Sequence, residues 1–180
     1  MLDKTNIPDE ILDLVDENDE IIGRVLKSEA NQDPNLLHRE IAVMIYDNQK
    51  RVLLQQRSKK KKVYPGYWTL SCAGHVPRGM DPLEAAHKEL KEELGFDTNL
   101  VFVNKWKFSY PNETHFCYGY IGQYSNQKII IDHDEVEQAR FASWEEYLNL
   151  TKRTKSSNKM LKDFWEGKFD QKTLLKSPEV

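Results

Sequence analysis

The stretch from Asp81 to Gly95 carries clear signals for the start and the end of a helix. Asp81 suits the N-cap, Pro82 suits the first helical position, and Glu84 falls at the third, where it can complete a capping box. Gly95 suits the helix end. Apolar residues recur between these limits at the spacing of one helix face, so the sequence predicts an amphipathic helix. This apolar stripe consists of Leu83, Ala86, Leu90 and Leu94.

Three glutamates share a face beside that stripe. Glu89, Glu92 and Glu93 stand at positions i, i+3 and i+4, so their charges repel one another. They also lie near the carboxyl end of the helix, where the macrodipole favours cations. A hard divalent cation would remove both unfavourable effects, the repulsion and the opposition of the macrodipole. Mg²⁺ and Mn²⁺ prefer oxygen ligands and can link carboxylate oxygens to phosphate oxygens. The alternative is a solvated face on which Lys88 and Lys91 relieve the repulsion.

Much of the remaining sequence favours β-strands. Runs rich in β-branched, aromatic and other apolar residues are separated by polar turns, and the first two pairs indicate hairpins. The expected strands cover residues 12–15, 21–25, 40–46, 51–57, 67–71, 100–103, 106–110, 115–124, 129–131 and 137–142. Strands therefore outnumber helices in the predicted fold.

The carboxyl-terminal part changes to a helical pattern. Ser143 and Glu146 resemble the two members of a capping box, and residues 158–166 place four apolar side chains at helical spacing before Gly167. The sequence contains no internal repeat, low-complexity tract or interdomain linker. Residues 1–180 are therefore expected to form a single domain.

The composition is typical of a soluble protein and restricts the classes of ligand. The formal net charge of −3 offers no global positive field for a nucleic-acid polymer, so any anionic ligand must be held locally. The sequence shows neither a signal peptide nor a run of about 18 apolar residues, so we expect a cytoplasmic protein without a membrane span. Cys72 and Cys117 are too few for a disulfide framework and are expected to be buried thiols.

The predicted helix and the loop before it resemble the signature of the Nudix hydrolases. That signature is a glycine-bearing loop followed by a helix that ends in Arg-Glu-x-x-x-Glu-Glu-x-Gly and an apolar residue. Here residues 88–96 read Lys-Glu-Leu-Lys-Glu-Glu-Leu-Gly-Phe, in the register set by Gly74, so the Nudix box covers residues 74–96. The resemblance implies an α+β fold with a Nudix-type mixed β-sheet flanked by helices, to which an N-terminal β-hairpin and C-terminal helices are added.

Two positions depart from the signature. Lys88 replaces an arginine; it can still pair with a carboxylate, although it lacks the planar fork of arginine. Met80 replaces a glutamate that helps to arrange the catalytic helix or the metal site in the family. Asp81 is adjacent, but its expected N-cap role already uses its side chain. Met80 therefore leaves open a domain that binds or senses a ligand without turnover.

The resemblance extends over residues 12–148 to the isopentenyl-diphosphate isomerase-like branch, through segments 12–23, 38–43, 64–69 and 134–136. This branch contains both isomerases and hydrolases of nucleotide-like diphosphates. His38, His75 and Glu113 match positions at which isomerases bind metal or move a proton. The isomerase cysteine, however, falls on Ala73, with Cys72 one residue early, and a shift of one residue along a strand turns a side chain to the other face.

Two further isomerase positions are changed, because a histidine falls on Asn31 and an acid falls on His115. Isomerisation of an unactivated alkene needs an acid and a base on opposite faces of the substrate, so these losses count against it. We therefore expect a divalent-metal-dependent Nudix hydrolase that cleaves the diphosphate linkage of a nucleoside diphosphate derivative or a related small molecule. An isopentenyl-diphosphate isomerase and a non-catalytic ligand-binding domain are the alternatives.

The resemblance also implies roles for individual side chains, with Mg²⁺ or Mn²⁺ as cofactor. Glu89, Glu92 and Glu93 are expected to hold the metal, helped by the carbonyl of Gly74, and Glu89 or Glu92 to orient the attacking water. Glu135 is a candidate second base, and an ordinary loop acid is the alternative.

A basic loop is expected to hold the substrate. By resemblance, Arg57, Lys61 and Lys62 lie over the cleft and clamp the diphosphate. His75 either contacts phosphate or holds the loop, and His38 is expected to be a structural histidine. The expected partner is a small-molecule diphosphate, with no nucleic-acid polymer and no membrane. A homodimer is among the expected assemblies, because Nudix relatives are often dimeric.

Overall fold

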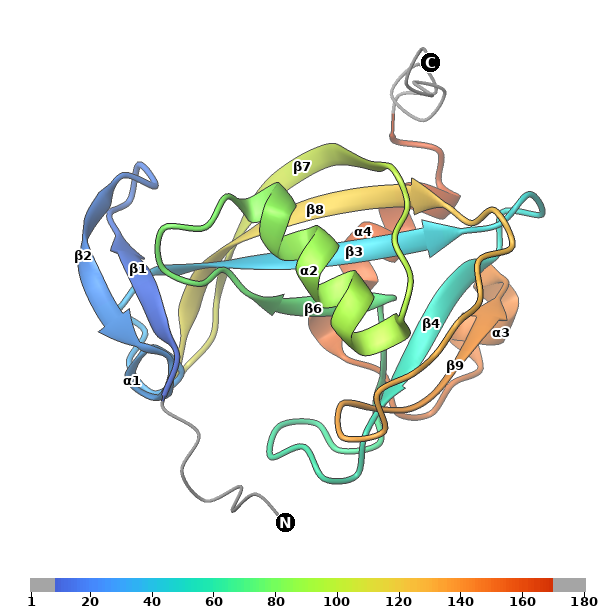
Figure 1. Cartoon of the computed structure of the whole chain (residues 1–180), viewed down its shortest axis with the longest axis horizontal. Helices are drawn as coiled ribbons and strands as arrows, with labels where there is room; N and C mark the ends of the chain where they lie inside the picture. The colour runs from blue at the N-terminus through green and yellow to red at the C-terminus, as the bar shows by residue number, and fades with distance from the viewer. Residues whose placement is uncertain (1–8, 170–180) are drawn as a thin grey trace.

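The computed structural model describes residues 9–169, which form a mixed β-sheet between helices and a smaller two-stranded sheet (Figure 1). The strands are β1 (Ile11–Val15), β2 (Ile21–Leu26), β3 (His38–Tyr46), β4 (Val52–Arg57), β5 (Trp68–Thr69), β6 (Cys72–His75), β7 (Leu100–Ser109), β8 (Thr114–Gln123) and β9 (Val136–Ala142). The helices are α1 (Lys27–Ala30), α2 (Pro82–Leu94), α3 (Trp144–Leu148) and α4 (Lys155–Trp165). None of these described helices is long and apolar enough to span a membrane.

The seven-stranded sheet is organised around β3. This strand pairs in parallel with β8 along its whole length, from His38 opposite His115 to Tyr46 opposite Gln123. Its other edge is shared, because β6 pairs with residues 40–43 and β4 meets the strand only at Tyr46. β9 and β5 pair with β4, and β7 pairs with β8, all in antiparallel directions. The parallel pair among antiparallel neighbours makes the sheet mixed, which confirms the expected fold class.

Alternate residues of β3 enter two different hydrophobic cores. Ile41 and Val43 belong to the core that includes the apolar side of α2, whereas Ala42 and Met44 belong to the core that includes residues of α4. Figure 1 accordingly shows α2 in front of the sheet, with α3 and α4 behind it. We call these two sides of the sheet the α2 face and the α4 face. Because side chains alternate along a strand, the position of a residue in its strand decides on which face its side chain lies.

The N-cap, first-position and end signals for α2 are confirmed, whereas Glu84 completes no capping box there. The side chain of Asp81 accepts a hydrogen bond from the backbone N–H of Leu83 at 2.8 Å, and Pro82 opens the helix. Gly95 ends it in the left-handed conformation, with φ at 74°. The apolar stripe turns to the sheet, although Leu83 in the first turn stays exposed. The residues that α2 buries are Ala85, Ala86, Leu90, Glu93 and Leu94.

The N-terminal hairpin and the capping box before α3 are also confirmed. β1 and β2 pair in antiparallel register, from Ile11 opposite Leu26 to Val15 opposite Ile21. The Ser143 side chain accepts from the N–H of Glu146, and the Glu146 carboxylate accepts from the N–H of Ser143 at 2.7 Å.

Three strand predictions were wrong in detail. Of residues 67–71, only Trp68 and Thr69 form a strand. Residues 100–109 form one strand rather than two, because the ladder with β8 continues through a bulge between Phe102 and Asn104. Residues 129–131 form no strand. Their segment instead caps the end of α2: the N–H of Ile130 donates to the carbonyl of Leu94 at 2.9 Å, and the N–H of Asp132 donates to that of Glu93 at 3.0 Å. These bonds satisfy carbonyls that the helix end leaves without partners.

Candidate active site

The three glutamates of α2 occupy different environments although they share one side of the helix. Glu93 is buried, and the side chain of Glu89 keeps only 17% of its surface exposed. The side chain of Glu92 is 56% exposed. Glu89 and Glu93 therefore lie against the sheet, and Glu92 forms the outer edge of the group.

Gly74 of β6 and Glu89 of α2 lie in direct contact. A Cβ atom added at Gly74 would lie 2.7 Å from Cδ and 2.9 Å from Oε2 of Glu89, which is closer than such atoms can approach. Glycine at this position thus lets the carboxylate rest against the backbone of β6. The structure brings together these two residues of the predicted metal set.

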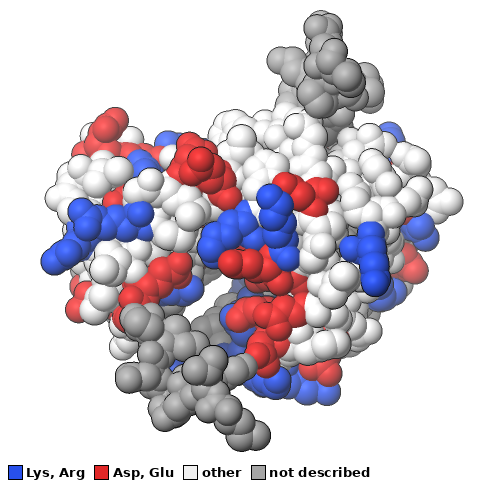
Figure 2. All heavy atoms as spheres, viewed as in Figure 1, with Lys and Arg blue, Asp and Glu red and all other residues white. Residues whose placement is uncertain are grey.

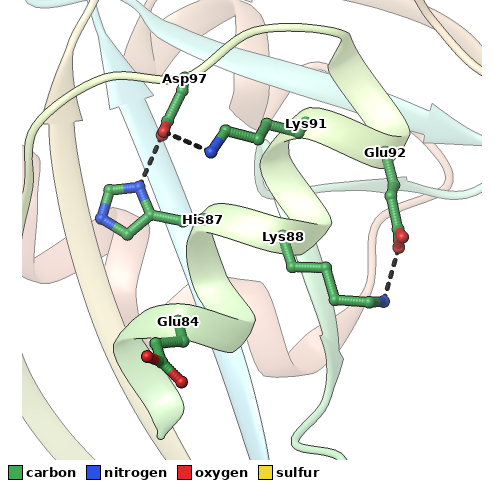
Figure 3. A pocket seen from close by; sticks show the side chains of 6 residues that line it. All are labelled: Glu84, His87, Lys88, Lys91, Glu92 and Asp97. Atoms are coloured by element: carbon green, nitrogen blue, oxygen red, sulfur yellow. Dashed lines mark hydrogen bonds and ion pairs between the residues drawn. The ribbon is translucent and has the colours of Figure 1, made fainter. Parts of the chain in front are cut away.

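Lys88 places its ammonium group between two of the glutamates. Its Nζ lies 2.7 Å from Oε2 of Glu92 and 3.5 Å from Oε1 of Glu89, and Figure 3 shows the pair with Glu92 on the outer side of α2. Burial disfavours the charged form of Lys88, but hydrogen bonds and charge attraction from both glutamates outweigh it and raise its pKa. The expected pairing of this lysine is confirmed. The ammonium group of Lys88 therefore offsets the repulsion between the carboxylates of Glu89 and Glu92.

Glu93 is held by a residue of a different strand. Gln55 of β4 donates from Nε2 to Oε2 of Glu93 at 2.8 Å. Burial raises the pKa of Glu93 to about 8, and the nearby charges of Glu89 and Glu135 add to the effect, while the bond from Gln55 and the charge of Lys61 oppose it. Without a cation, this carboxyl is protonated over most of the neutral pH range.

The basic loop is joined to the acidic loop before β9. Lys61 forms an ion pair with Glu135, and Nζ of Lys60 lies 2.6 Å from Oδ1 of Asp134. The backbone N–H of Ser58 also donates to the carbonyl of Glu135 at 2.9 Å. The proposed clamp lysine and the proposed second base are therefore paired with each other.

Arg57 and Lys62 are less engaged. Nε of Arg57 donates to the carbonyl of Val63 at 3.0 Å, which holds the loop in its turn. Lys62 is exposed. Figure 2 shows basic and acidic side chains side by side across the α2 face, so this face presents no field of a single sign.

A second cluster lies on the α4 face. The resemblance to isomerases identifies three of its members, His38, His75 and Glu113, but not Glu40. Within residues 9–169, two groups of potential ligands have atoms that all lie within 4.8 Å of one another, and the α2 glutamates form neither. The groups are His38, Glu40 and His75, and Glu40, Glu113 and His115. Glu40 belongs to both, so we call the five residues the His/Glu cluster.

The register of the sheet assembles the His/Glu cluster. Glu40 pairs with His75 of β6, and His38 pairs with His115 of β8. Oε1 of Glu40 lies 3.3 Å from Nε2 of His75, and Oε2 lies 3.4 Å from Nε2 of His115. His75 also lies 3.0 Å through Nε2 from Oδ1 of Asn31, so it contacts the second cluster rather than the α2 glutamates. The alternation of His38 and Glu40 along one strand is the sequence signal for this cluster.

The electrostatics of the His/Glu cluster suit a cation. Burial opposes ionisation of Glu40, but the surrounding imidazoles outweigh it and hold the pKa of Glu40 well below its ordinary value. Burial lowers the pKa of His75 to about 3 and also lowers that of His115. Nε2 of His38 and Nδ1 of His115 are buried without a hydrogen-bond partner among the described residues. Burial opposes protonation of His38, but hydrogen bonds to Glu40 and to the carbonyl of Leu36 outweigh it and raise the pKa of His38. The unpartnered nitrogens beside a carboxylate can act as metal ligands when their imidazoles are neutral.

Cys72 and Ala73 lie on opposite faces. Cys72 pairs with Val43, belongs to the core under α2 and has a strongly raised thiol pKa because it is completely buried. Ala73 pairs with Ala42, which belongs to the α4 face of Glu40. The expected change of face is confirmed, and position 73 offers the His/Glu cluster a methyl group in place of a thiol.

Two further residues bear on the candidate site. The charge of Lys27 in α1 acts on both His75 and Glu89, so this lysine lies near the region between the two sites. Sequence reasoning missed Lys27 because a single lysine after a strand carries no local signal. Met80 packs against the core under α2. This position therefore contributes an apolar contact to the core.

The sequence matches the NUDIX domain family over residues 36–164. The chain belongs to the Nudix superfamily. An isopentenyl-diphosphate Delta-isomerase of Serratia proteamaculans is 36% identical over 151 residues, which cover 81% of this chain and 82% of that protein. An uncharacterised Nudix hydrolase of Listeria monocytogenes is 35% identical over 136 residues, which cover 74% and 80%. These relatives support the isopentenyl-diphosphate isomerase-like branch of the superfamily.

The fold of this Nudix protein also occurs among solved structures. A crystal structure of a Deinococcus radiodurans protein superposes with a TM-score of 0.72 at 20% identity and covers 87% of this chain and 99% of that one. At this level of identity the likeness shows the fold alone. The chemistry must be argued from the side chains of this chain.

Proposed function

We propose that this Nudix protein is a divalent-metal-dependent hydrolase of a diphosphate linkage in a nucleoside diphosphate derivative or a related small molecule. The observation that carries this proposal is the arrangement of Glu89 and Glu92 around the ammonium of Lys88, with Glu89 resting on Gly74. Carboxylate and carbonyl oxygens fit Mg²⁺ or Mn²⁺ better than softer ions. Displacement of Lys88 by such an ion would keep the charges of the glutamates balanced.

Each residue then has a definable role. Glu89, Glu92 and Glu93 would hold the metal, with the carbonyl of Gly74 beside Glu89. When bound, the metal would neutralise charge on the diphosphate oxygens and acidify a water molecule. Glu89 or Glu92 would orient that water. Glu135 would be available as a second base once its pair with Lys61 opens.

The basic loop would bind the substrate. Lys61 and Lys62 carry the charge needed for a diphosphate, and Arg57 would contribute its remaining N–H donors while Nε keeps the loop in place. His75 would either hold the His/Glu cluster in place or, as a member of that cluster, contact a phosphate group of the substrate. A small diphosphate molecule is the expected ligand, and a homodimer and a cytoplasmic location remain part of the proposal.

A second candidate function is the isomerisation of isopentenyl diphosphate. It is favoured by the His/Glu cluster, whose mixed nitrogen and oxygen donors fit Zn²⁺, Mn²⁺ or Fe²⁺, and by the activity in the names of relatives. Proton transfer to an alkene nevertheless needs an acid on that face. Ala73 has no acidic group, and the buried thiol of Cys72 belongs to the other face. We therefore rank hydrolysis first.

One experiment separates the two functions. Purified protein is incubated with Mg²⁺ or Mn²⁺ and a panel of nucleoside diphosphates, nucleoside triphosphates, nucleotide sugars, coenzyme A and isopentenyl diphosphate, followed by phosphorus and proton NMR. Hydrolysis predicts new phosphate resonances that Glu93→Gln removes and that Glu84→Gln, a matched change at an exposed position of α2, leaves unchanged. Alkene rearrangement without phosphate release, lost in Glu40→Gln, would replace the hydrolase proposal by the isomerase.

A further inference from the structure

Gln55 is a buried polar side chain that the steps above do not use. It is 3% exposed and lies two residues after Leu53, so alternation along β4 directs it to the α2 face. Its backbone is fixed on both sides, because it pairs with Thr69 of β5 and with Ala139 of β9. A side chain on such a central strand is held more rigidly than one on a loop.

The two ends of the Gln55 carboxamide have different surroundings. Nε2 donates to Oε2 of Glu93 at 2.8 Å, across 38 positions of sequence. Oε1 is buried and has no hydrogen-bond partner within residues 9–169. When Glu93 is ionised, turning the carboxamide over would set two acceptors against each other. Buried acceptors without a partner are rare, so Oε1 indicates a donor that arrives from outside the protein.

We propose that Gln55 is the positioning residue for metal binding by Glu93. Its N–H group holds Oε2 of Glu93 in place and would leave the rest of that carboxylate available to the metal. Its own carboxamide oxygen would accept a hydrogen bond from water at the occupied site. This inference rests on the metal site of the proposed function and extends it to a residue outside the Nudix box.

The chemistry of an amide suits this role. A lysine at position 55 would neutralise Glu93 and compete with the metal, and an apolar residue would leave the buried carboxylate without support. The neutral amide supplies one donor to the ligand and one acceptor to its water. Partners that hold a ligating side chain typically change metal affinity or activity 10- to 100-fold when they are removed.

The test measures Mn²⁺ binding in the absence of substrate. Gln55→Met keeps the length of the side chain but removes the donor and acceptor. Gln138→Met is the matched control, because Gln138 is exposed on the neighbouring β9 and its side chain donates to the side chain of Gln56 at 2.7 Å. Free Mn²⁺ is followed by electron paramagnetic resonance, both in the unmodified chain and in a Glu40→Gln background that removes the shared carboxylate of the His/Glu cluster.

Gln55→Met should weaken Mn²⁺ binding about tenfold or more, while Gln138→Met should change it less than about twofold. Thermal unfolding checks that both variants fold. If Gln55→Met does not, Gln55→Asn, which withdraws the amide by one methylene group, should give the same loss. Wild-type Mn²⁺ affinity in a folded Gln55 variant overturns the role of Gln55, even where hydrolysis is present. Weakened Mn²⁺ binding in a chain that hydrolyses no substrate supports that role and removes the proposed function instead.

Discussion

At single positions of this site, the available space limits the choice of residue as much as charge does. Gly74 is a glycine because the carboxylate of Glu89 occupies the volume of a Cβ atom, and Lys88 fills the gap between two carboxylates. Met80 makes an apolar contact with the core at the position where the Nudix signature has a glutamate. At this scale the site depends on a few atoms whose displacement by an ångström would change it.

Gly74→Ala should therefore damage the site more than the fold. The added methyl group must push Glu89 off β6, and we expect hydrolysis to fall by about 100-fold with weaker Mn²⁺ binding. Gly23→Ala is the control, because its Cβ would meet Leu14 at an ordinary 3.7 Å. Equal rates for the two variants, measured by phosphorus NMR, would contradict a metal-binding role for Glu89 at this position.

The raised pKa of Glu93 predicts a pH dependence of stability. The pKa is about 8 in the folded protein and near 4.5 in the unfolded chain, so between these values only the folded state holds the proton. Stability should fall as the pH rises from about 5 to 8 and then level off. Glu93→Gln should remove this slope and be more stable than the wild type at pH 9, by roughly 5 kcal/mol.

Urea denaturation in EDTA at pH 5, 7 and 9 measures this effect. Addition of Mg²⁺ at pH 9 should restore part of the lost stability to the wild type and none to Glu93→Gln. Parallel pH profiles for the two proteins would show that Glu93 is ionised in the folded state without a metal.

Among the elements, α2 depends on what covers its carboxyl end. Gly95 ends the helix with φ at 74°, and a Cβ there would lie 2.7 Å from the carbonyl oxygen of Ile130. The segment from Ile130 to Asp132 donates to two carbonyls of the last turn and leads into the acidic loop. The end of α2 and the loop that carries Glu135 are therefore positioned together.

Gly95→Ala should destabilise the protein more than the matched change Gly167→Ala. Both glycines follow a helix in the left-handed conformation, but a Cβ at Gly167 meets no atom within 4 Å. The conformational cost, about 1 kcal/mol, is shared, and the clash with Ile130 adds to it only at Gly95. Chemical denaturation should show a larger loss for Gly95→Ala. Equal losses would mean that the segment after Ile129 moves aside freely.

The ion pair between Lys61 of the basic loop and Glu135 of the acidic loop predicts different effects of one substitution on KM and on kcat. Because Lys61 is held by Glu135, Glu135→Gln should free the lysine for a diphosphate and lower KM by roughly two- to fivefold at low salt. If Glu135 is also the second base, kcat should fall in the same variant. The change in KM should shrink in high salt, which screens the pair. An unchanged KM would show that this ion pair does not compete with the substrate.

The whole molecule places two candidate metal sites on opposite faces of one sheet. The α2 glutamates offer oxygen donors, and the His/Glu cluster offers both nitrogen and oxygen. The alternation of side chains along β3 and β6 separates the two sites. Ile41 and Gly74 lie on the α2 face, whereas Glu40 and His75 lie on the α4 face. The two sites are therefore expected to bind independently and to prefer different metals.

Cobalt absorption tests this separation. Co²⁺ should give visible bands from the His/Glu cluster, which Glu40→Gln removes and Glu93→Gln preserves. Changes in thermal stability from the two substitutions should add in the double variant, because the residues belong to opposite faces of the sheet. Loss of the cobalt bands in Glu93→Gln would show that the two faces form a single site.

Much of the architecture follows from local signals. Asp81 and Gly95 bound α2, Ser143 caps α3, and apolar alternation marks most strands, because capping and side-chain alternation act over a few residues. The Nudix signature likewise lies within one continuous segment. Local pattern failed at residues 129–131, where apolar composition suggested a strand but the open carbonyls of α2 supplied the hydrogen-bond partners.

The sequence by itself therefore determined helix α2, the placement of its glutamates and the change of face between Cys72 and Ala73. Only the tertiary structure decided that Gln55 meets Glu93, that Lys61 meets Glu135, and that Glu40 joins histidines from three strands. The physical reason is the range of the interactions. Caps and alternation depend on neighbours along the chain, whereas these contacts depend on strand register and loop closure, which bring together residues about 35 to 75 positions apart.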